Sequence, residues 1–225
     1  REINTALSSF DDFLFDNYKA LLIFLVVIGH FIDLCAKNNA FLNTSKWLIY
    51  AVHMPAFIFV SGYFSKKEIP LRTLIQKLLV PYLVYECLYF VLYVCLGKST
   101  GLYLIYPKFS LWYILALFFW RLITPCVKKI PHHMVLAIIC GLLIGFSDMK
   151  DNLLSIPRII VFYPYFLAGI HFDREILTKH RAIAKYRIIA ACSLIGFVLF
   201  LILDPIHKTG SPKPFYGRYN YDSLN

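Results

Sequence analysis

The amino-acid sequence predicts an all-α integral membrane protein, a polytopic bundle of about seven transmembrane helices. Of its 225 residues, 59% are hydrophobic and only 16% are charged, and the mean hydropathy is +0.64. Soluble domains usually carry about 25% charged residues. The apolar residues come in long runs, and short polar or basic gaps, often with a proline, separate these runs. This pattern predicts several membrane spans and shows no soluble domain.

Seven apolar runs are interpreted as membrane spans. They cover residues 18–36, 47–64, 78–96, 111–127, 133–146, 158–172 and 188–203. A span needs about 20 residues, so the shorter runs would have to extend into their polar flanks or be shielded by neighbouring helices. We expect residues 1–17 to form a cytoplasmic lead with a short interfacial helix, and residues 204–225 to form an extracytoplasmic tail or a truncated loop.

The basic residues gather in gaps on one side of the predicted bundle, at residues 65–77, 128–129 and 173–187. Lys and Arg accumulate in the cytoplasmic loops of membrane proteins. The net charge of +10 is therefore explained by topology and not by nucleic-acid binding. The sequence predicts a multi-pass protein of the cell membrane with a cytoplasmic N-terminus, which contacts membrane lipid and binds no nucleic acid.

The first apolar run carries ionisable residues at helical spacing. Lys19 and His30 are separated by close to three turns of α-helix and so share one face. Asp16 lies one turn before Lys19, and Asp33 lies one turn after His30, where it is spaced to orient the imidazole. Ionisable groups at membrane depth are costly and usually face a cavity or a partner. Two interpretations stay open: a functional stripe, or interfacial anchors with His30 bonded to a neighbouring helix.

Four more polar residues lie within or at the ends of apolar runs and are candidates for a substrate pocket: His53, Glu86, Arg121 and Arg158. His53 precedes a proline and is either a satisfied histidine at a helix kink or part of a pocket wall. Glu86 either lines a pocket or pairs with a nearby cation. The two arginines either line a pocket or extend toward the membrane surface.

Two shorter features also have alternative interpretations. The basic connection at residues 65–77 is either a topogenic loop or a site for a phosphate-bearing ligand, since Lys and Arg suit phosphate. The pair Ser61 and Gly62 favours close helix packing. No phosphate-loop, nucleophile-elbow or zinc-protease motif is present, and the six cysteines have no paired spacing. We expect no metal and no disulfide framework.

Five blocks, taken in order, resemble the acyltransferase-3 superfamily of membrane acyltransferases. They are DNYKALLIFLVVIGHFID, AVHMPAFIFVSGYFSKK, KLLVPYLVYE, SLWYILALFFWRL and PRIIVFYPYFLAGIHF, and they cover most of residues 16–172. The most similar subgroup is the fucose 4-O-acetylase-like one, which includes sugar and polysaccharide O-acetyltransferases. The resemblance implies transfer of an acyl group, usually acetyl from acetyl-CoA, to a hydroxyl of a cell-envelope carbohydrate or a lipid-linked glycan.

The resemblance also implies roles for particular residues. His30 matches the family's catalytic histidine, and Lys19 stands where the family motif has arginine, which keeps a cation but loses the bidentate guanidinium. Arg72 and Lys77 match basic residues before the family's third helix and would hold the phosphates of acetyl-CoA. Trp112 matches the tryptophan of the fourth helix.

The family has more helices than the seven predicted here. Either further helices lie beyond this sequence or the protein is a shortened relative, and the activity of this chain alone stays open. Two alternatives remain beside the acyltransferase. One is a transporter-like protein whose buried charges line a substrate path. The other is a non-catalytic membrane module of a larger protein.

Overall fold

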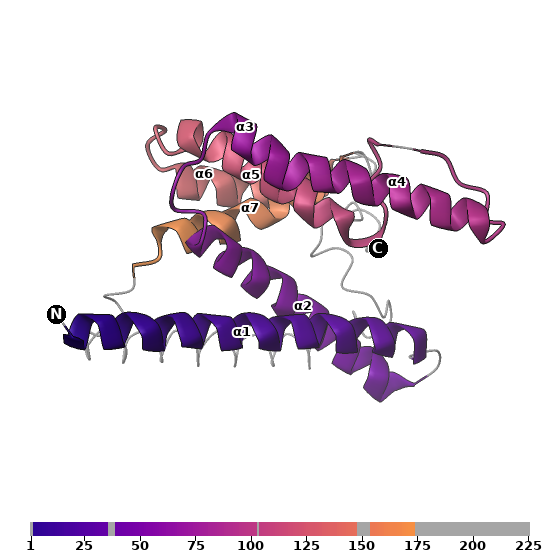
Figure 1. The fold of residues 1–225 in the computed structure, drawn as a ribbon, viewed down its shortest axis with the longest axis horizontal. Helices are drawn as coiled ribbons and strands as arrows, with labels where there is room; N and C mark the ends of the chain where they lie inside the picture. Colours follow the sequence, from indigo (N-terminus) through magenta and orange to yellow (C-terminus); the bar gives the residue numbers. More distant parts are fainter. Residues whose placement is uncertain (1, 36–38, 103, 148–153, 174–225) are drawn as a thin grey trace. The chain divides into compact units, whose positions relative to one another are not determined.

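The computed structural model describes residues 2–35, 39–102, 104–147 and 154–173 (Figure 1). Every regular element in these ranges is helical, which confirms the all-α prediction for them. The predicted span at residues 188–203 and the predicted tail at 204–225 lie outside the described residues. The helices are α1 (Glu2–Cys35), α2 (Ala40–Tyr63), α3 (Leu71–Leu74), a π-helical turn (Ile75–Leu79), α4 (Val80–Cys95), α5 (Trp112–Val127), α6 (His133–Leu143) and α7 (Ile156–His171).

Six of the seven predicted runs fall on these helices, but two boundaries differ from the prediction. The lead does not form a separate short helix, because α1 is continuous from Glu2 to Cys35. The second run starts earlier than predicted, since α2 begins at Ala40 and includes the polar residues that were expected in a loop. In both places helical hydrogen bonding continues through polar sequence, which an apolar pattern alone does not indicate.

One helix of the described residues is long and apolar enough to cross a membrane. The elements α3, the π-helical turn and α4 form a continuous helix of 25 residues, Leu71–Cys95. The π-helical turn has a local cause in Pro81, which lacks an N–H and whose ring crowds the carbonyl four residues earlier. The helices α5, α6 and α7 are apolar but shorter, so seven spans are not confirmed.

The chain forms two compact units, and one boundary between them falls inside α2, between Met54 and Pro55. In the first unit, the N-terminal part of α2 packs closely on α1 at Gly29. A Cβ atom at Gly29 would lie 3.2 Å from a methyl group of Ile49 and 3.4 Å from the ring of Tyr50. The missing side chain therefore allows the two helices to approach at this point.

In the second unit, α5 and α7 pack through aromatic side chains and run in the same direction. The ring of Trp112 stacks on Phe162 with centroids 5.8 Å apart, and Trp120 stacks on Phe166 at 5.4 Å. The indole Nε1–H of Trp120 donates to the carbonyl of Ile159 over 2.8 Å. Because the two stacked ring pairs advance together along both helices, α5 and α7 begin at the same end of this unit (Figure 1).

Two glycines let the end of α2 cross α7 at backbone contact within the second unit. A Cβ atom at Gly62 would overlap the backbone carbonyl of Phe166. A Cβ atom at Gly169 would overlap the backbone carbonyl of Phe59. Each helix thus presents a glycine to the backbone of the other. This crossing confirms the close helix packing predicted from Ser61 and Gly62.

Candidate functional site

His30, the predicted catalytic residue, faces α2 within the first unit. Its Nδ1 atom lies 3.1 Å from the hydroxyl oxygen of Tyr50, and the two rings meet edge to face. The glycine before His30 makes this contact possible, because a larger residue at position 29 would press on the Tyr50 ring. Tyr50 is therefore the described partner of the Nδ1 atom of His30. The side chain of Asp33, the partner predicted from helical spacing, lies outside what the structure describes.

Tyr50 is a candidate site residue that the sequence reasoning missed. Its only signal in the sequence is its position three residues before His53, which places the two side chains on neighbouring positions of one helix face. Their rings lie 5.1 Å apart between centroids, edge to face. An aromatic hydroxyl in an apolar run gives no indication of which helix it will meet.

His53 itself has a local hydrogen bond. Its Nδ1–H donates to the carbonyl of Ile49, one turn earlier in α2, over 2.7 Å, and the side chain is buried. Pro55 follows two residues later and interrupts the helical hydrogen bonds of this region. This arrangement satisfies the imidazole within its own helix. It supports the interpretation of His53 as a structural histidine beside a proline.

Lys19 lies on α1 and forms an exposed ion pair with Asp16, with 3.1 Å between Nζ and Oδ1. Exposed pairs of this kind contribute little to stability. Lys19 and His30 are about 16 Å apart along the axis of α1, from the helical rise per residue. The structure therefore places both on one helix but does not bring them into contact.

The two cations predicted to hold the donor lie at the start of the helix Leu71–Cys95. Arg72 is in α3 and Lys77 is in the π-helical turn, and both side chains are exposed. Exposed Lys and Arg side chains within two turns of each other can bind a phosphate-bearing ligand from water.

Trp112 and Arg158 are two predicted site residues that the structure brings together. The guanidinium carbon of Arg158 lies 5.3 Å from the centroid of the Trp112 ring, and both side chains are buried. Trp112 begins α5, and Arg158 lies in the first turn of α7. A buried cation over an indole ring is a favourable arrangement, worth about 2 kcal/mol when desolvated.

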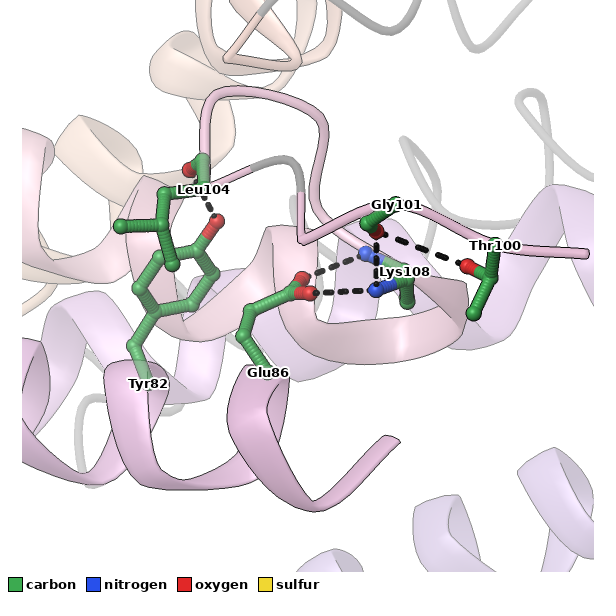
Figure 2. Close-up of polar contacts among 6 residues, drawn as sticks. All are labelled: Tyr82, Glu86, Thr100, Gly101, Leu104 and Lys108. Carbon is green, nitrogen blue, oxygen red and sulfur yellow. Dashed lines mark hydrogen bonds and ion pairs between the residues drawn. The ribbon is translucent and has the colours of Figure 1, made fainter. Parts of the chain in front are cut away.

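Glu86 pairs with a cation from the connection between α4 and α5 (Figure 2). The side chain is fully buried, and its Oε1 accepts the backbone N–H of Lys108 over 2.6 Å. Its Oε2 lies 3.7 Å from the ammonium of Lys108, which also donates to the carbonyl of Gly101 over 3.0 Å. Of the two interpretations from the sequence, pairing with a cation is the one that matches this geometry.

Arg121, in the second half of α5, has a backbone partner. Its Nη2–H donates to the carbonyl of Lys67 over 3.1 Å, which ties α5 to the connection between α2 and α3. This contact supports a structural role. A place for Arg121 in a substrate pocket stays a prediction.

The family model described as "Acyltransferase domain" matches residues 14–224. The chain belongs to this acyltransferase family. Proteins of the family are membrane proteins, which agrees with the apolar composition and with the helix Leu71–Cys95. The matched range contains all the candidate residues considered above.

Two curated relatives carry the name nodulation protein NolL. The protein from Sinorhizobium fredii is 26% identical over 216 residues, which cover 84% of this chain and 57% of the relative. The protein from Mesorhizobium japonicum is 27% identical over 220 residues, which cover 84% of this chain and 56% of the relative. The chain thus spans about half the length of these relatives. No solved structure matches it significantly.

Proposed function

We propose that the protein is a membrane-bound O-acyltransferase that moves an acetyl group from acetyl-CoA to a hydroxyl of a cell-envelope carbohydrate or lipid-linked glycan. Membership of the acyltransferase family supports the reaction class. The contact between His30 Nδ1 and the Tyr50 hydroxyl carries the assignment of the base. The donor binds on the cytoplasmic side, where the N-terminus also lies, in a multi-pass arrangement.

His30 acts as the general base in this proposal. When Nδ1–H donates to the Tyr50 oxygen, the Nε2 lone pair is the proton acceptor, and Tyr50 holds the ring in that tautomer. The acceptor hydroxyl gives its proton to Nε2 as its oxygen bonds to the thioester carbon. The carbon–sulfur bond then breaks, and the CoA thiolate leaves. Histidine is the side chain that most often serves as a general base.

The cations Arg72 and Lys77, with Lys19, hold the phosphates of the donor in this proposal. Replacing Lys77 with alanine should raise the apparent Michaelis constant for acetyl-CoA about 10-fold. This is the loss of affinity expected when one charge-assisted phosphate contact is removed. Lys129→Ala is a matched control, because it removes one exposed lysine from the end of α5. If both variants keep the parent constant, the cations of the α3 region have only a topogenic role.

His30→Ala tests the assignment of the base. In the full-length protein it should lower acetyl transfer to the glycan by about 10²–10⁴-fold while CoA binding persists. Tyr50→Phe removes one hydrogen bond to the imidazole and should cost on the order of 10-fold. His53→Ala should cost much less than His30→Ala, since His53 bonds within its own helix.

The same assay separates the proposal from its alternatives. A folded His30→Ala protein that transfers acetyl at the parent rate would show that His30 is not the base. If the parent protein moves a labelled sugar across the vesicle membrane and does not acetylate it, the protein is a transporter.

A further inference from the structure

The connection between α4 and α5 turns back along α4 and does not stay at its end. The hydroxyl of Tyr82 donates to the carbonyl of Leu104 over 2.8 Å, and Glu86 binds Lys108 (Figure 2). Tyr82 lies about 20 Å along the helix axis from Cys95, the last residue of α4. Figure 1 shows the connection leaving the far end of α4 and doubling back toward α5. We call residues 104–108 the returning segment.

The returning segment reaches the middle of the helix that can cross a membrane. The 25 residues of Leu71–Cys95 extend about 37 Å, against a hydrocarbon core of about 30 Å. Tyr82 lies near the centre of that length. Non-helical backbone at such a depth persists only where protein groups or a water-filled cavity satisfy its N–H and C=O groups.

Three backbone groups of the returning segment have protein partners of this kind. The carbonyl of Leu104 accepts from Tyr82, the carbonyl of Ile105 accepts from the backbone N–H of Leu154 over 2.7 Å, and the N–H of Lys108 donates to Glu86. The side chains of Leu104 and Ile105 are apolar and are 41% and 51% exposed. Backbone groups paired within the protein, together with outward apolar side chains, are expected for a segment in lipid.

Glu86 is the buried charged residue to which the returning segment is bonded. A fully buried carboxylate is costly unless it is paired and hydrogen-bonded. Lys108 donates its backbone N–H to Oε1, while its ammonium, 3.7 Å from Oε2, supplies the opposite charge at ion-pair and not hydrogen-bond distance. The ammonium also lies 5.7 Å from the centroid of the Phe90 ring. The pair is neutral as a whole and closes the returning segment onto α4.

We propose that residues 104–108 form a re-entrant segment within the membrane and that Glu86 is the positioning residue that holds it there. Lys108 immediately precedes the 3-10 turn Phe109–Leu111, which leads into Trp112, and the carbonyl of Lys108 accepts the N–H of Leu111. Glu86 therefore sets where α5 and Trp112 begin. The proposal rests on the membrane location in the proposed function and not on its chemistry.

Cysteine labelling in membrane vesicles tests the depth of the segment without any assay of activity. Ile105→Cys, in the protein freed of its own cysteines, should react with a membrane-impermeant maleimide at least about 10-fold more slowly than Ser99→Cys, because an apolar environment suppresses the thiolate. Ser99 is exposed just beyond the end of α4. Equal rates at the two positions would show that the segment lies in water and would overturn the proposal.

Two pairs of variants, each made in the Ile105→Cys background, test Glu86 itself. Glu86→Gln keeps an oxygen that accepts the Lys108 N–H, whereas Glu86→Leu does not. Lys108→Ala keeps the backbone N–H, whereas Lys108→Pro removes it at a φ of −78°, which proline adopts without strain. Both Lys108 variants also carry Glu86→Gln, so that no buried carboxylate is left without its cation. Glu86→Leu and Lys108→Pro should raise labelling at position 105 about 10-fold, and Glu86→Gln and Lys108→Ala should leave it within about 2-fold of the parent.

Acetyl transfer provides the second readout. It should fall with Glu86→Leu and Lys108→Pro and persist with the two conservative variants. Slow labelling at position 105 that none of the four variants changes would show that Glu86 does not hold the segment. Activity absent from the parent protein, with the labelling pattern as expected, would contradict the proposed function and leave this inference standing.

Discussion

The helices α4 and α7 have the same length and similar apolar composition, yet they have opposite surroundings. In α4, Tyr82 and Glu86 are buried, whereas Val84, Leu88 and Val91 are each more than half exposed. In α7, most side chains from Pro157 to Ile170 are buried. Both helices belong to the second unit. The comparison shows that apolar composition does not distinguish a largely exposed helix from one enclosed by protein.

The difference between the two helices follows from small and hydrogen-bonding groups. Gly169 lets α7 touch the backbone of α2, and the Ile159 carbonyl accepts a hydrogen bond from an indole. In α4 the buried groups lie one turn apart, at Tyr82 and Glu86, and form a single stripe. In a membrane, close approach and interhelical hydrogen bonds drive helix association, because lipid is as apolar as leucine.

The largest effect is expected at the crossing of α2 and α7. Gly169→Ala places a Cβ atom 2.8 Å from the backbone nitrogen of Tyr63 and against the carbonyl of Phe59, and no rotamer relieves a clash with backbone. We expect a loss of about 3 kcal/mol or more in the free energy of unfolding. Thermal unfolding in detergent, followed by circular dichroism, measures it.

Gly141→Ala in α6 is the matched control for that variant. Its added Cβ atom would find its nearest neighbour at 3.6 Å, an ordinary contact, so alanine should be neutral or stabilise α6 by up to about 1 kcal/mol. Equal stability of the Gly169→Ala and Gly141→Ala proteins would refute the close crossing.

An intermediate effect is expected at Trp120, between α5 and α7. Trp120→Phe keeps an aromatic ring next to Phe166 but removes the hydrogen bond to the carbonyl of Ile159. The expected loss is about 1–3 kcal/mol. Tyr85→Phe on the exposed face of α4 also removes one polar group and should change stability by less than about 0.5 kcal/mol. Similar losses in the two variants would contradict the contrast between the helices.

The smallest effect is expected on the outer face of α4. Leu88 is 57% exposed, so Leu88→Ala should change the unfolding free energy by less than about 0.5 kcal/mol in detergent. The same denaturation measurement checks this value. A loss of about 2 kcal/mol or more, typical of a buried leucine, would show that another part of the full-length protein covers this face.

Much of the fold and part of the candidate site could be predicted from the sequence. Long apolar runs predicted six of the helices, and the pair Ser61 and Gly62 predicted a close crossing, because helical periodicity and small residues act locally. A bond from His30 to a neighbouring helix was one of the interpretations left open, but its partner Tyr50 could not be predicted, since the contact joins residues on two helices. Pairing of Glu86 with a cation was likewise one of two interpretations, but Lys108 as its partner could not be predicted, because it lies on a connection that folds back.

The sequence by itself determined the helical class, the apolar character and the membership of an acyltransferase family. These properties follow from composition, periodicity and the order of short motifs, which do not depend on how helices pack. Only the tertiary structure decided that α7 is enclosed while α4 is exposed, and that Trp112 meets Arg158. Those outcomes depend on which backbones can approach one another and which buried polar groups find partners, and both are set by residues distant in the chain.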